Sequence, residues 1–524
     1  MLWKLQRKDP VAAAAANRGT KMSSRLKLFY WSFGLIFVWE VMPEYIMPVL
    51  TGVSVFCLAK RDSLLFTRLF GGANGNEGLG FLSICFDFQY IGSGPLYLPL
   101  QTTVNTLVGY LGGIVMFMGL YYSNTWRAKD LPFLSQLLFT EASNSTKPIR
   151  FNQTAVLDST GTVDLDLLAL QGVPLLTPTY ASYVLVQNLA IAATFTHMFL
   201  YHWHDLKSAW SFLSLSSLKH LAQPWKWNWK FWQNETGSDS DSKVETDPHY
   251  QMMLAYADAP QWWYGSVLII SAMVGLICIY QADSGLPWWA FFVALGIAAI
   301  CILFFGSQYA MTGFHVPVQP LIQMLGAYIN PGKPLTSMYF TLFGYNTVVQ
   351  GYYMLSDLKL GQYAKLPPRA TFTMQMVGTI MGAIMNYIMM LQITTNQKEI
   401  LLSIEGTNIW SGAQIQSFNT QAVSWGGLAK QMYSVGRGRY QWVPLAFLIG
   451  FVAPLPFYFA HRLWPKLGFN YWNVAIIVWH LGYLCTGINS SLTSVFILAF
   501  WSQLYLRKYR PEVSTPHRRL FTLS

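Results

Sequence analysis

Long apolar runs, separated by short polar or basic stretches, dominate this chain. Continuous runs cover 100–122, 180–201, 262–280, 371–391 and 442–460. About 20 apolar residues in a helix cross the hydrocarbon core of a bilayer. Shorter and interrupted runs add further segments. The pattern predicts an all-α fold, a polytopic transmembrane helical bundle with roughly 10–12 membrane segments, some of them broken or re-entrant.

Glycine and proline interrupt three of the apolar regions. One region is broken at Pro43 and Pro48, one at residues 92–95, and one at residues 331–334. In a bilayer such breaks are tolerated only where the freed backbone groups are buried in protein or line a wet cavity. Transporters build substrate sites from such half-helices near the bilayer midplane. We therefore predict that the breaks at 92–95 and 331–334 are corresponding half-helices of two structural repeats and line a binding site.

Polar stretches divide the chain into two tails, one transmembrane domain and three long loops. The short basic stretches at 356–369 and 461–466 are expected in the cytoplasm, where lysine and arginine of short loops are enriched. Glycosylation acceptor patterns at Asn144 and Asn152 favour an outside location, whereas a third at Asn234 lies in a loop expected inside. The predicted parts are a cytoplasmic basic tail at 1–27, a transmembrane domain at 28–506, outside loops at 123–178 and 395–440, a cytoplasmic loop at 202–260 and a cytoplasmic tail at 507–524.

Composition excludes a soluble enzyme of this length. The 524 residues are 53% hydrophobic and only 11% charged, whereas soluble chains carry roughly 25% charged residues. The net charge of +11 predicts no nucleic-acid partner, because the basic residues cluster in tails and short loops as in a protein embedded in a lipid bilayer. The five cysteines all lie in apolar segments without metal-ligand spacing, so we expect no metal site.

Three acidic residues lie inside apolar segments. They are Glu40, Glu44 and Asp87, and no lysine or arginine occurs within 28–59 or 78–126. An acid at membrane depth is costly and suggests function. Without a nearby base it must be protonated, hydrated or paired with something that arrives. The pattern favours a carrier coupled to protons or another cation, or one that binds a substrate's amino group. The alternative for the two glutamates is a solvated position at the membrane surface.

Histidines provide a second set of candidates. His197, His202 and His204 cluster at the predicted inner end of a span, where a histidine either relays protons or simply lies at the interface. His315 precedes the break at 331–334 and is a candidate gate. A membrane enzyme, such as an acyl or glycosyl transferase, would need a catalytic histidine or acid pair at one interface. The candidates here are dispersed through the spans.

Two motifs carry a resemblance to the oligopeptide transporter family. The first is the NPGKP motif of that family, here Asn330-Pro331-Gly332-Lys333-Pro334. The second is usually written KIPPR and reads Lys365-Leu366-Pro367-Pro368-Arg369 in this chain. Glu44 stands where many members have glycine, a variant that resembles a fungal branch. Shorter stretches that look similar to the family are 43–48, 78–80, 86–88, 259–264 and 423–426.

The resemblance implies a secondary active transporter that imports small oligopeptides by proton symport, with protons as the coupling ion and no other cofactor. It implies a multi-pass protein, which we expect in the plasma membrane; the oligomeric state stays open. The alternatives are a carrier of metal chelates or siderophore-like ligands from the same family, and a shortened, non-transporting paralogue. The alternative of a shortened paralogue arises because family members usually begin with further membrane segments, and none is recognised upstream of Arg25.

The expected binding site combines the breaks with the acids. The helix N-termini near 330–333 and 92–95 would meet the peptide carboxylate. Asp87, with Glu44 second, would take the coupling proton or the peptide amine. Lys365 and Arg369 are expected to anchor their loop at anionic headgroups. The full set of site candidates is Asp87, Glu44, Glu40, Asn330, Lys333, Tyr345 and Asn346.

Overall fold

In a computed structural model of the chain, most of the described residues are helical and one small three-stranded sheet lies among them, which confirms the predicted helical bundle. The chain divides into two compact units. The smaller unit comprises residues 1–46, 213–278 and 349–398, and the larger unit the remainder. The residues that the structure describes are 18–60, 62–72, 78–141, 148–210, 253–403, 412–436, 438–485 and 489–510.

Six helices of the described residues are long and apolar enough to cross a membrane. Each has at least the roughly 20 residues needed to span about 30 Å of hydrocarbon. Shorter apolar helices such as α24 (Val474–Gly482) accompany them. The six are α7 (Leu100–Tyr122), α9 (Pro178–Tyr201), α13 (Gln261–Gln281), α14 (Trp288–Thr312), α18 (Pro368–Asn396) and the pair α22–α23 (Trp442–Val452 and Leu455–Leu463).

In the smaller unit, α2 (Arg18–Val41) is broken where the sequence predicts it. The helix ends in a π-helical turn, η3 (Met42–Ile46), in which Pro43 is buried. Proline removes a backbone donor and clashes with the preceding turn, so the regular helix cannot continue. The helix begins at Arg18, ten residues before the predicted start of the apolar segment at residue 28. No proline or glycine cluster interrupts this polar stretch, so the helix extends into it.

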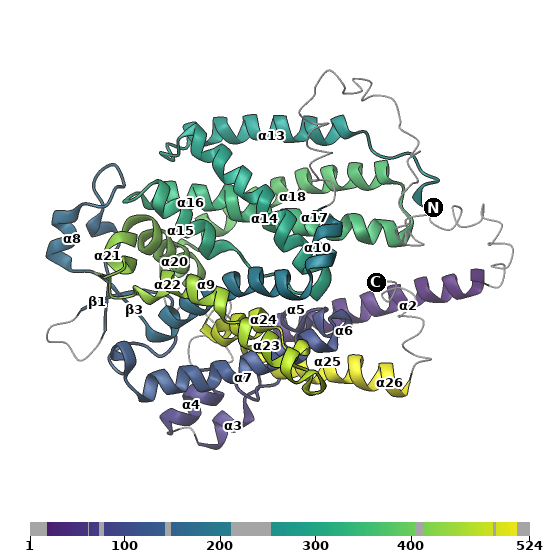
Figure 1. Ribbon diagram of the computed structural model, residues 1–524, viewed down its shortest axis with the longest axis horizontal. Coiled ribbons are helices and arrows are strands. Elements are labelled where there is room, and N and C mark those ends of the chain that lie inside the picture. Colours follow the sequence, from purple (N-terminus) through teal and green to yellow (C-terminus); the bar gives the residue numbers. More distant parts are fainter. Residues whose placement is uncertain are drawn as a thin grey trace. The chain divides into compact units, whose positions relative to one another are not determined.

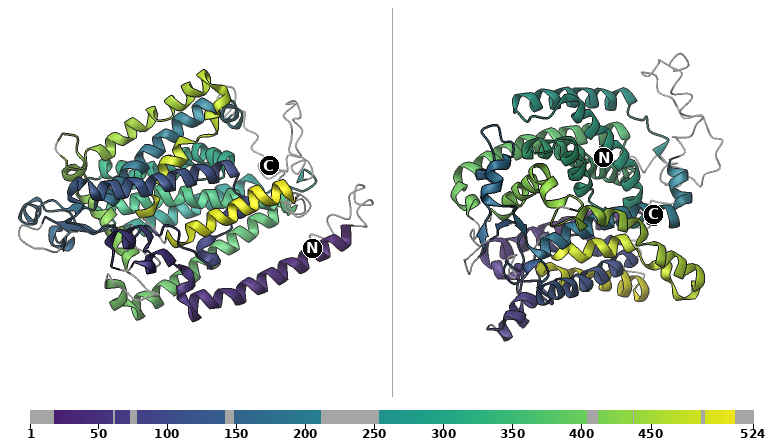
Figure 2. Two further views of the ribbon diagram at one scale, coloured as in Figure 1. Left: turned by 90° about the horizontal axis from the view of Figure 1, so that it is seen from below. Right: turned by 60° about the vertical axis from the view of Figure 1, so that its left-hand side comes forward.

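The larger unit is built around α9. It packs between α22 and α24, and α24 also packs on α7; these four helices lie side by side (Figures 1 and 2). The Asn188 amide donates to the Val443 carbonyl at 3.0 Å, and the Thr196 hydroxyl donates to the Phe451 carbonyl at 2.9 Å. The donors advance from residue 188 to 196 along α9 while the acceptors advance from 443 to 451 along α22, so the two helices run parallel. Such interhelical hydrogen bonds satisfy polar groups that hydrocarbon cannot.

The predicted outside loop 123–178 is folded rather than extended. Its strands β1 (Leu138–Thr140), β2 (Ile149–Arg150) and β3 (Leu175–Leu176) form an antiparallel sheet in the order β2-β1-β3. The helix α8 (Leu165–Gln171) lies between β2 and β3 in the chain. Buried side chains from the loop join the core that α7 and α9 form. The loop is therefore a small cap on one end of the larger unit.

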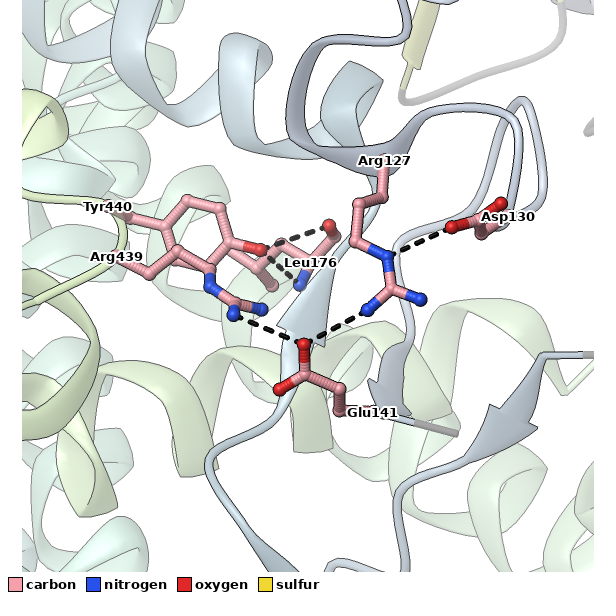
Figure 3. Close-up of polar contacts among 6 residues, drawn as sticks. All are labelled: Arg127, Asp130, Glu141, Leu176, Arg439 and Tyr440. Carbon is pink, nitrogen blue, oxygen red and sulfur yellow. Dashed lines mark hydrogen bonds and ion pairs between the residues drawn. The ribbon is translucent and has the colours of Figure 1, made fainter. Parts of the chain in front are cut away.

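Polar contacts fasten this cap to the segment before α22 (Figure 3). Arg127 pairs with Asp130 at 2.9 Å and with Glu141 at 3.0 Å, and Arg439 reaches Glu141 at 3.3 Å. These groups are about half exposed, so each pair contributes only about 0–1 kcal/mol. The Tyr440 hydroxyl, by contrast, is buried; it accepts from the Leu176 N–H at 2.8 Å and donates to the Leu176 carbonyl at 3.2 Å.

Replacing Tyr440 by phenylalanine is expected to lower the Tm of the detergent-solubilised protein. Burial raises the pKa of Tyr440 to about 12, so the hydroxyl keeps its proton at neutral pH and both hydrogen bonds persist. Leaving buried partners unsatisfied costs about 1–3 kcal/mol. The control is Tyr471→Phe, whose ring is exposed. Equal Tm values for the two variants would show that the cap is held by the surface ion pairs instead.

Candidate functional site

Residues 330–333 join two half-helices of the larger unit, α15 (Gln319–Ile329) and α16 (Pro334–Thr341). The 11 residues of α15 span about 16 Å, roughly half the hydrocarbon core. The chain then continues from α16 through the π-helical turn η9 (Leu342–Asn346) into α17 (Thr347–Ala364). The structure thus has a break in the apolar region at the position that the sequence predicts.

The backbone of this loop is held from two sides. Gly332 adopts a left-handed φ of 81°, which glycine tolerates best. Its N–H donates to the Gly426 carbonyl at 3.0 Å, and its carbonyl accepts from the Val163 N–H at 2.9 Å. Gly426 belongs to a second broken segment, the π-helical turn η10 (Ala422–Gly427) that follows α20 (Ala413–Gln421). Two stretches that resemble the family therefore meet, and Figure 1 shows α15, α16, α20 and α21 (Ala429–Tyr433) gathered together.

Gly426 permits this close contact because it has no side chain. A Cβ there would lie 2.7 Å from Ser337 Cβ and 2.8 Å from Pro334 Cα. Real Cβ atoms do not approach other atoms so closely, so the two segments could not keep their separation with any other residue. The predicted outside loop 395–440 therefore contains the helix α20 and the turn η10, and η10 packs against both α15 and α16.

Beside this contact lies a network of four neutral amide side chains joined through one serine hydroxyl, which we call the amide network: Gln319, Gln323, Gln421, Ser417 and Gln136. The Gln421 Oε1 accepts from Gln319 Nε2 at 2.7 Å and from Gln323 Nε2 at 2.9 Å. The chain of contacts continues from Gln421 through Ser417 to Gln136. Gln323 and Ser417 are buried, whereas Gln319, Gln421 and Gln136 are half-buried.

The chemistry of the amide network matches that of a polypeptide main chain. A primary amide both donates and accepts hydrogen bonds, as a peptide group does. None of the five side chains carries a charge, so the network can bind a main chain without selecting a charged side chain. The sequence pattern alone did not single out these residues. The available signal was Gln319 and Gln323 at i and i+4, which lie on one face of a helix inside an apolar region.

Asp87 is fully buried in the larger unit. It caps the short helix α5 (Phe88–Ile91), where its Oδ1 accepts from the Gln89 N–H at 2.8 Å. Its Oδ2 has no hydrogen-bond partner within the described part of the chain. The neighbouring Cys85 backbone exchanges two hydrogen bonds with the Ser494 hydroxyl, at 2.9 and 2.8 Å. The carboxyl is thus fixed in a dry position against α25 (Leu492–Ala499).

The break at 92–95 has different packing partners from the break at 331–334. Gly92 has a φ of 67°, and α5 and α6 (Gly94–Tyr97) have only four residues each. Helices so short lack the aligned peptide dipoles that would attract a carboxylate. α6 packs against α25 and the π-helical turn η15 (Phe500–Leu506), and the Gln503 amide donates to the Leu96 carbonyl. Asp87 and this break thus form a cluster with the C-terminal segment.

The remaining motif residues occupy mixed positions. Lys333 is exposed, whereas Asn330 is half-buried and its Nδ2 has no hydrogen-bond partner among the described residues. Tyr345 is half-buried and Asn346 exposed, both within η9. Glu40 and Glu44 are half-buried residues of the smaller unit. The structure therefore places Asn330 and Lys333 in the loop that contacts Gly426, and the two glutamates in the other unit.

The second motif forms the turn between α17 and α18 in the smaller unit. Lys365 adopts a left-handed φ of 61°, and the Leu366 N–H donates to the Gly361 carbonyl at 2.9 Å. Pro367 and Pro368 begin α18, where proline is favoured. The Arg369 Nε donates to the Asp258 carbonyl at 3.1 Å. The contacts of this motif are those of a helix-to-helix connection.

Two histidines of the predicted cluster lie close together, since the ring centroids of His197 and His202 are 6.1 Å apart. His197 is buried in α9 and stacks near Tyr201, His202 lies 3.4 Å from Asp205, and His204 is exposed. His315 is half-buried. A histidine that the sequence analysis did not consider, His480, is buried with Nδ1 2.7 Å from the Ile476 carbonyl. Among the described residues, no group of three or more His, Cys, Asp or Glu side chains is placed to hold a metal ion.

Apolar helices interrupted by half-helices, with a polar network at the interruption, define the architecture of many secondary transporters. Comparison with known families agrees with this class. The sequence model described as "OPT oligopeptide transporter protein" matches residues 8–517, so the chain belongs to the oligopeptide transporter family. No solved structure matches the chain.

Named relatives occur in plants and fungi. "Oligopeptide transporter 7" of Arabidopsis thaliana is 26% identical over 501 residues, covering 94% of this chain and 60% of the relative. "Glutathione transporter 1" of Schizosaccharomyces pombe is 29% identical over 504 residues, covering 93% and 53%. "Sexual differentiation process protein isp4" of the same organism is 26% identical, covering 96% and 59%. The chain spans about half to three fifths of these relatives, and the family consists of membrane transporters rather than enzymes.

Proposed function

We propose that this protein imports small oligopeptides across the plasma membrane by proton symport. The observation that carries the proposal is the amide network beside the contact between Gly332 and Gly426. Half-helices at such a break offer binding groups inside the membrane, and neutral amides suit a peptide main chain. The names of the relatives, oligopeptide and glutathione transporters, support the same substrate class.

Asp87 is the proposed site of the coupling proton. Burying a carboxylate that no cation pairs with is costly, and acidic residues inside membrane segments mark proton pathways in pumps and transporters. The Asp87 Oδ2 has the free acceptor capacity that a proton needs. Proton binding at Asp87 and peptide binding at the amide network then use separate parts of the larger unit. A symporter would couple the two events through movement of the broken segments between these parts.

Uptake into proteoliposomes tests the proposal. A labelled tetrapeptide is expected to accumulate when the outside is made acidic, and the accumulation should disappear when a protonophore collapses the gradient. Glutathione and a metal chelate serve as competing substrates. Absence of tetrapeptide uptake at every pH would refute the proposal, and uptake of the chelate alone would favour the other branch of the family.

Replacing Gln421 by leucine is expected to raise the KM for peptide about tenfold or more. The change removes the amide that accepts from Gln319 and Gln323 and that the peptide main chain would contact. Leaving a peptide group in the complex without its hydrogen-bond partner costs about 1–3 kcal/mol, and every 1.4 kcal/mol is a factor of ten. The concentration dependence of uptake measures the effect. Gln392→Leu, at an exposed position of α18, is the control. An unchanged KM in the Gln421 variant would remove the amide network from the site.

A further inference from the structure

A surface segment of the cap presents a side chain that transport does not use. Asn152, Gln153 and Thr154 form a glycosylation acceptor pattern, and Asn152 is exposed. The Asn152 Oδ1 accepts from the Thr154 hydroxyl at 2.8 Å and from the Thr154 N–H at 3.2 Å. The amide oxygen is thus occupied by the residue that defines the pattern. Glycans are attached through the amide nitrogen, on the other side of the same group.

The residues around Asn152 hold it at the surface. Phe151 and Val156 are buried in the core of the cap. The Gln153 amide turns inward and donates to the Thr420 hydroxyl at 3.3 Å, next to Gln421 of the amide network. Asn152 therefore lies between two inward-facing neighbours in the chain and can carry a bulky group without disturbing the core.

Helix α9 places the cap on one side of the membrane. Its 24 residues span about 36 Å, more than the roughly 30 Å hydrocarbon core. The cap precedes its N-terminus, since Thr177 of the cap is its N-cap and donates to the Ser135 carbonyl. At the other end, Tyr201 packs on Tyr458, whose hydroxyl accepts from Arg462 at 3.0 Å. The cap and the basic stretch 461–466 thus lie at opposite ends of α9.

The short loop at the end opposite the cap gives the orientation, because the positive-inside rule counts lysine and arginine of short loops and acidic residues contribute little. At the cap end, Arg127 of the cap and Arg439 of the segment before α22 are paired with Asp130 and Glu141. At the opposite end Arg462 has no ion pair within the described residues, in a short loop that also contains Lys466. Excess lysine and arginine in short loops mark the cytoplasmic side. The cap then faces the lumen of the endoplasmic reticulum during synthesis.

From the exposed acceptor and the side of the membrane on which it lies, we propose that Asn152 carries an N-linked oligosaccharide. The donor would be a lipid-diphosphate-linked oligosaccharide. The bond between its anomeric carbon and the phosphate oxygen breaks, and a bond from that carbon to Asn152 Nδ2 forms. One amide proton is lost and the lipid diphosphate leaves. The glycan would then lie at the outer face, next to Gln153, whose amide donates to Thr420 beside the amide network.

The test uses the full chain expressed in eukaryotic cells and treated with an N-glycosidase, with electrophoretic mobility as the readout. All variants carry Asn144→Gln, because the Asn144 pattern lies outside the described residues in the same loop. The parent is expected to migrate faster after the glycosidase treatment. Thr154→Ser, which keeps the pattern, should behave like the parent. Thr154→Ala and Asn152→Gln should migrate at one position with or without the enzyme.

The control is Asn234→Gln, in the loop on the predicted cytoplasmic side, which should leave the glycosidase effect unchanged. No mobility change in the parent, or a change that survives Asn152→Gln, would overturn the proposal. If Asn234→Gln, and no other variant, abolishes the mobility change caused by the glycosidase, the chain crosses the membrane in the opposite orientation. The outcome is independent of peptide transport, because glycan transfer acts on the chain during its synthesis.

Discussion

Replacing Gly426 by alanine is expected to reduce peptide uptake by about tenfold or more while the protein still inserts into the membrane. The added Cβ would lie 2.7 Å from Ser337 Cβ and 2.8 Å from Pro334 Cα. Overpacking of this kind costs typically 1–3 kcal/mol. Relief requires η10 to move away from the 330–333 loop, which would break the 3.0 Å hydrogen bond between the Gly332 N–H and the Gly426 carbonyl. The separation of the half-helices, and with it the geometry of the amide network, should change.

A matched control exists in α14. Gly296 is also a helical glycine, but a Cβ there meets no atom within 4 Å. Gly296→Ala should leave initial uptake rates unchanged, since alanine is the better helix former. Both variants are quantified by protein recovered from the membrane and by their elution in detergent. Normal uptake by Gly426→Ala at equal recovery would contradict a functional contact between the two broken segments.

Replacing Asp87 by asparagine is expected to abolish proton-driven accumulation while leaving exchange of peptide across the membrane. Asparagine has nearly the same shape, and its Oδ1 can still accept from the Gln89 N–H. It cannot bind and release a proton. The variant should therefore equilibrate labelled peptide in vesicles loaded with unlabelled peptide, yet fail to concentrate it when an inward proton gradient is imposed.

Asp164→Asn provides the comparison. Asp164 also caps a short helix, α8, and its Oδ1 accepts from the Asp166 N–H at 2.8 Å, but it lies in the cap rather than in the buried interior. Loss of a capping carboxylate alone should not alter coupling. If Asp87→Asn concentrates peptide as well as the unmodified protein does, another group carries the coupling proton and Asp87 is only a helix cap.

The sequence predicts the breaks well but not their partners. Proline and glycine disrupt helices through local sterics, so the interruption at 331–334 can be read from the residues alone. Which segments then pack together depends on tertiary contacts. The break at 331–334 packs on η10, while the break at 92–95 packs on the C-terminal segment. Gly426 shows why: its role depends on atoms of Ser337 and Pro334 that lie far away in the sequence.

The amide network escaped prediction for a related reason. α20 has a polar sequence, and its low hydrophobicity is typical of an outside loop. Its polar side chains are instead satisfied by one another and by glutamines of α15 and the cap. Buried polar residues that pair across elements leave no periodic signal in the chain. Asp87, by contrast, lies in an apolar stretch of the sequence, and the structure buries its side chain completely.

Uptake of a labelled neutral tetrapeptide and of its main-chain N-methylated analogue, compared in proteoliposomes under the same inward proton gradient, tests the central claim most directly. N-methylation removes the peptide N–H donors and leaves the side chains unchanged. If the amide network binds the main chain, the tetrapeptide accumulates and the analogue does not. Equal accumulation of both peptides, or accumulation of neither, would contradict peptide main-chain recognition by this site.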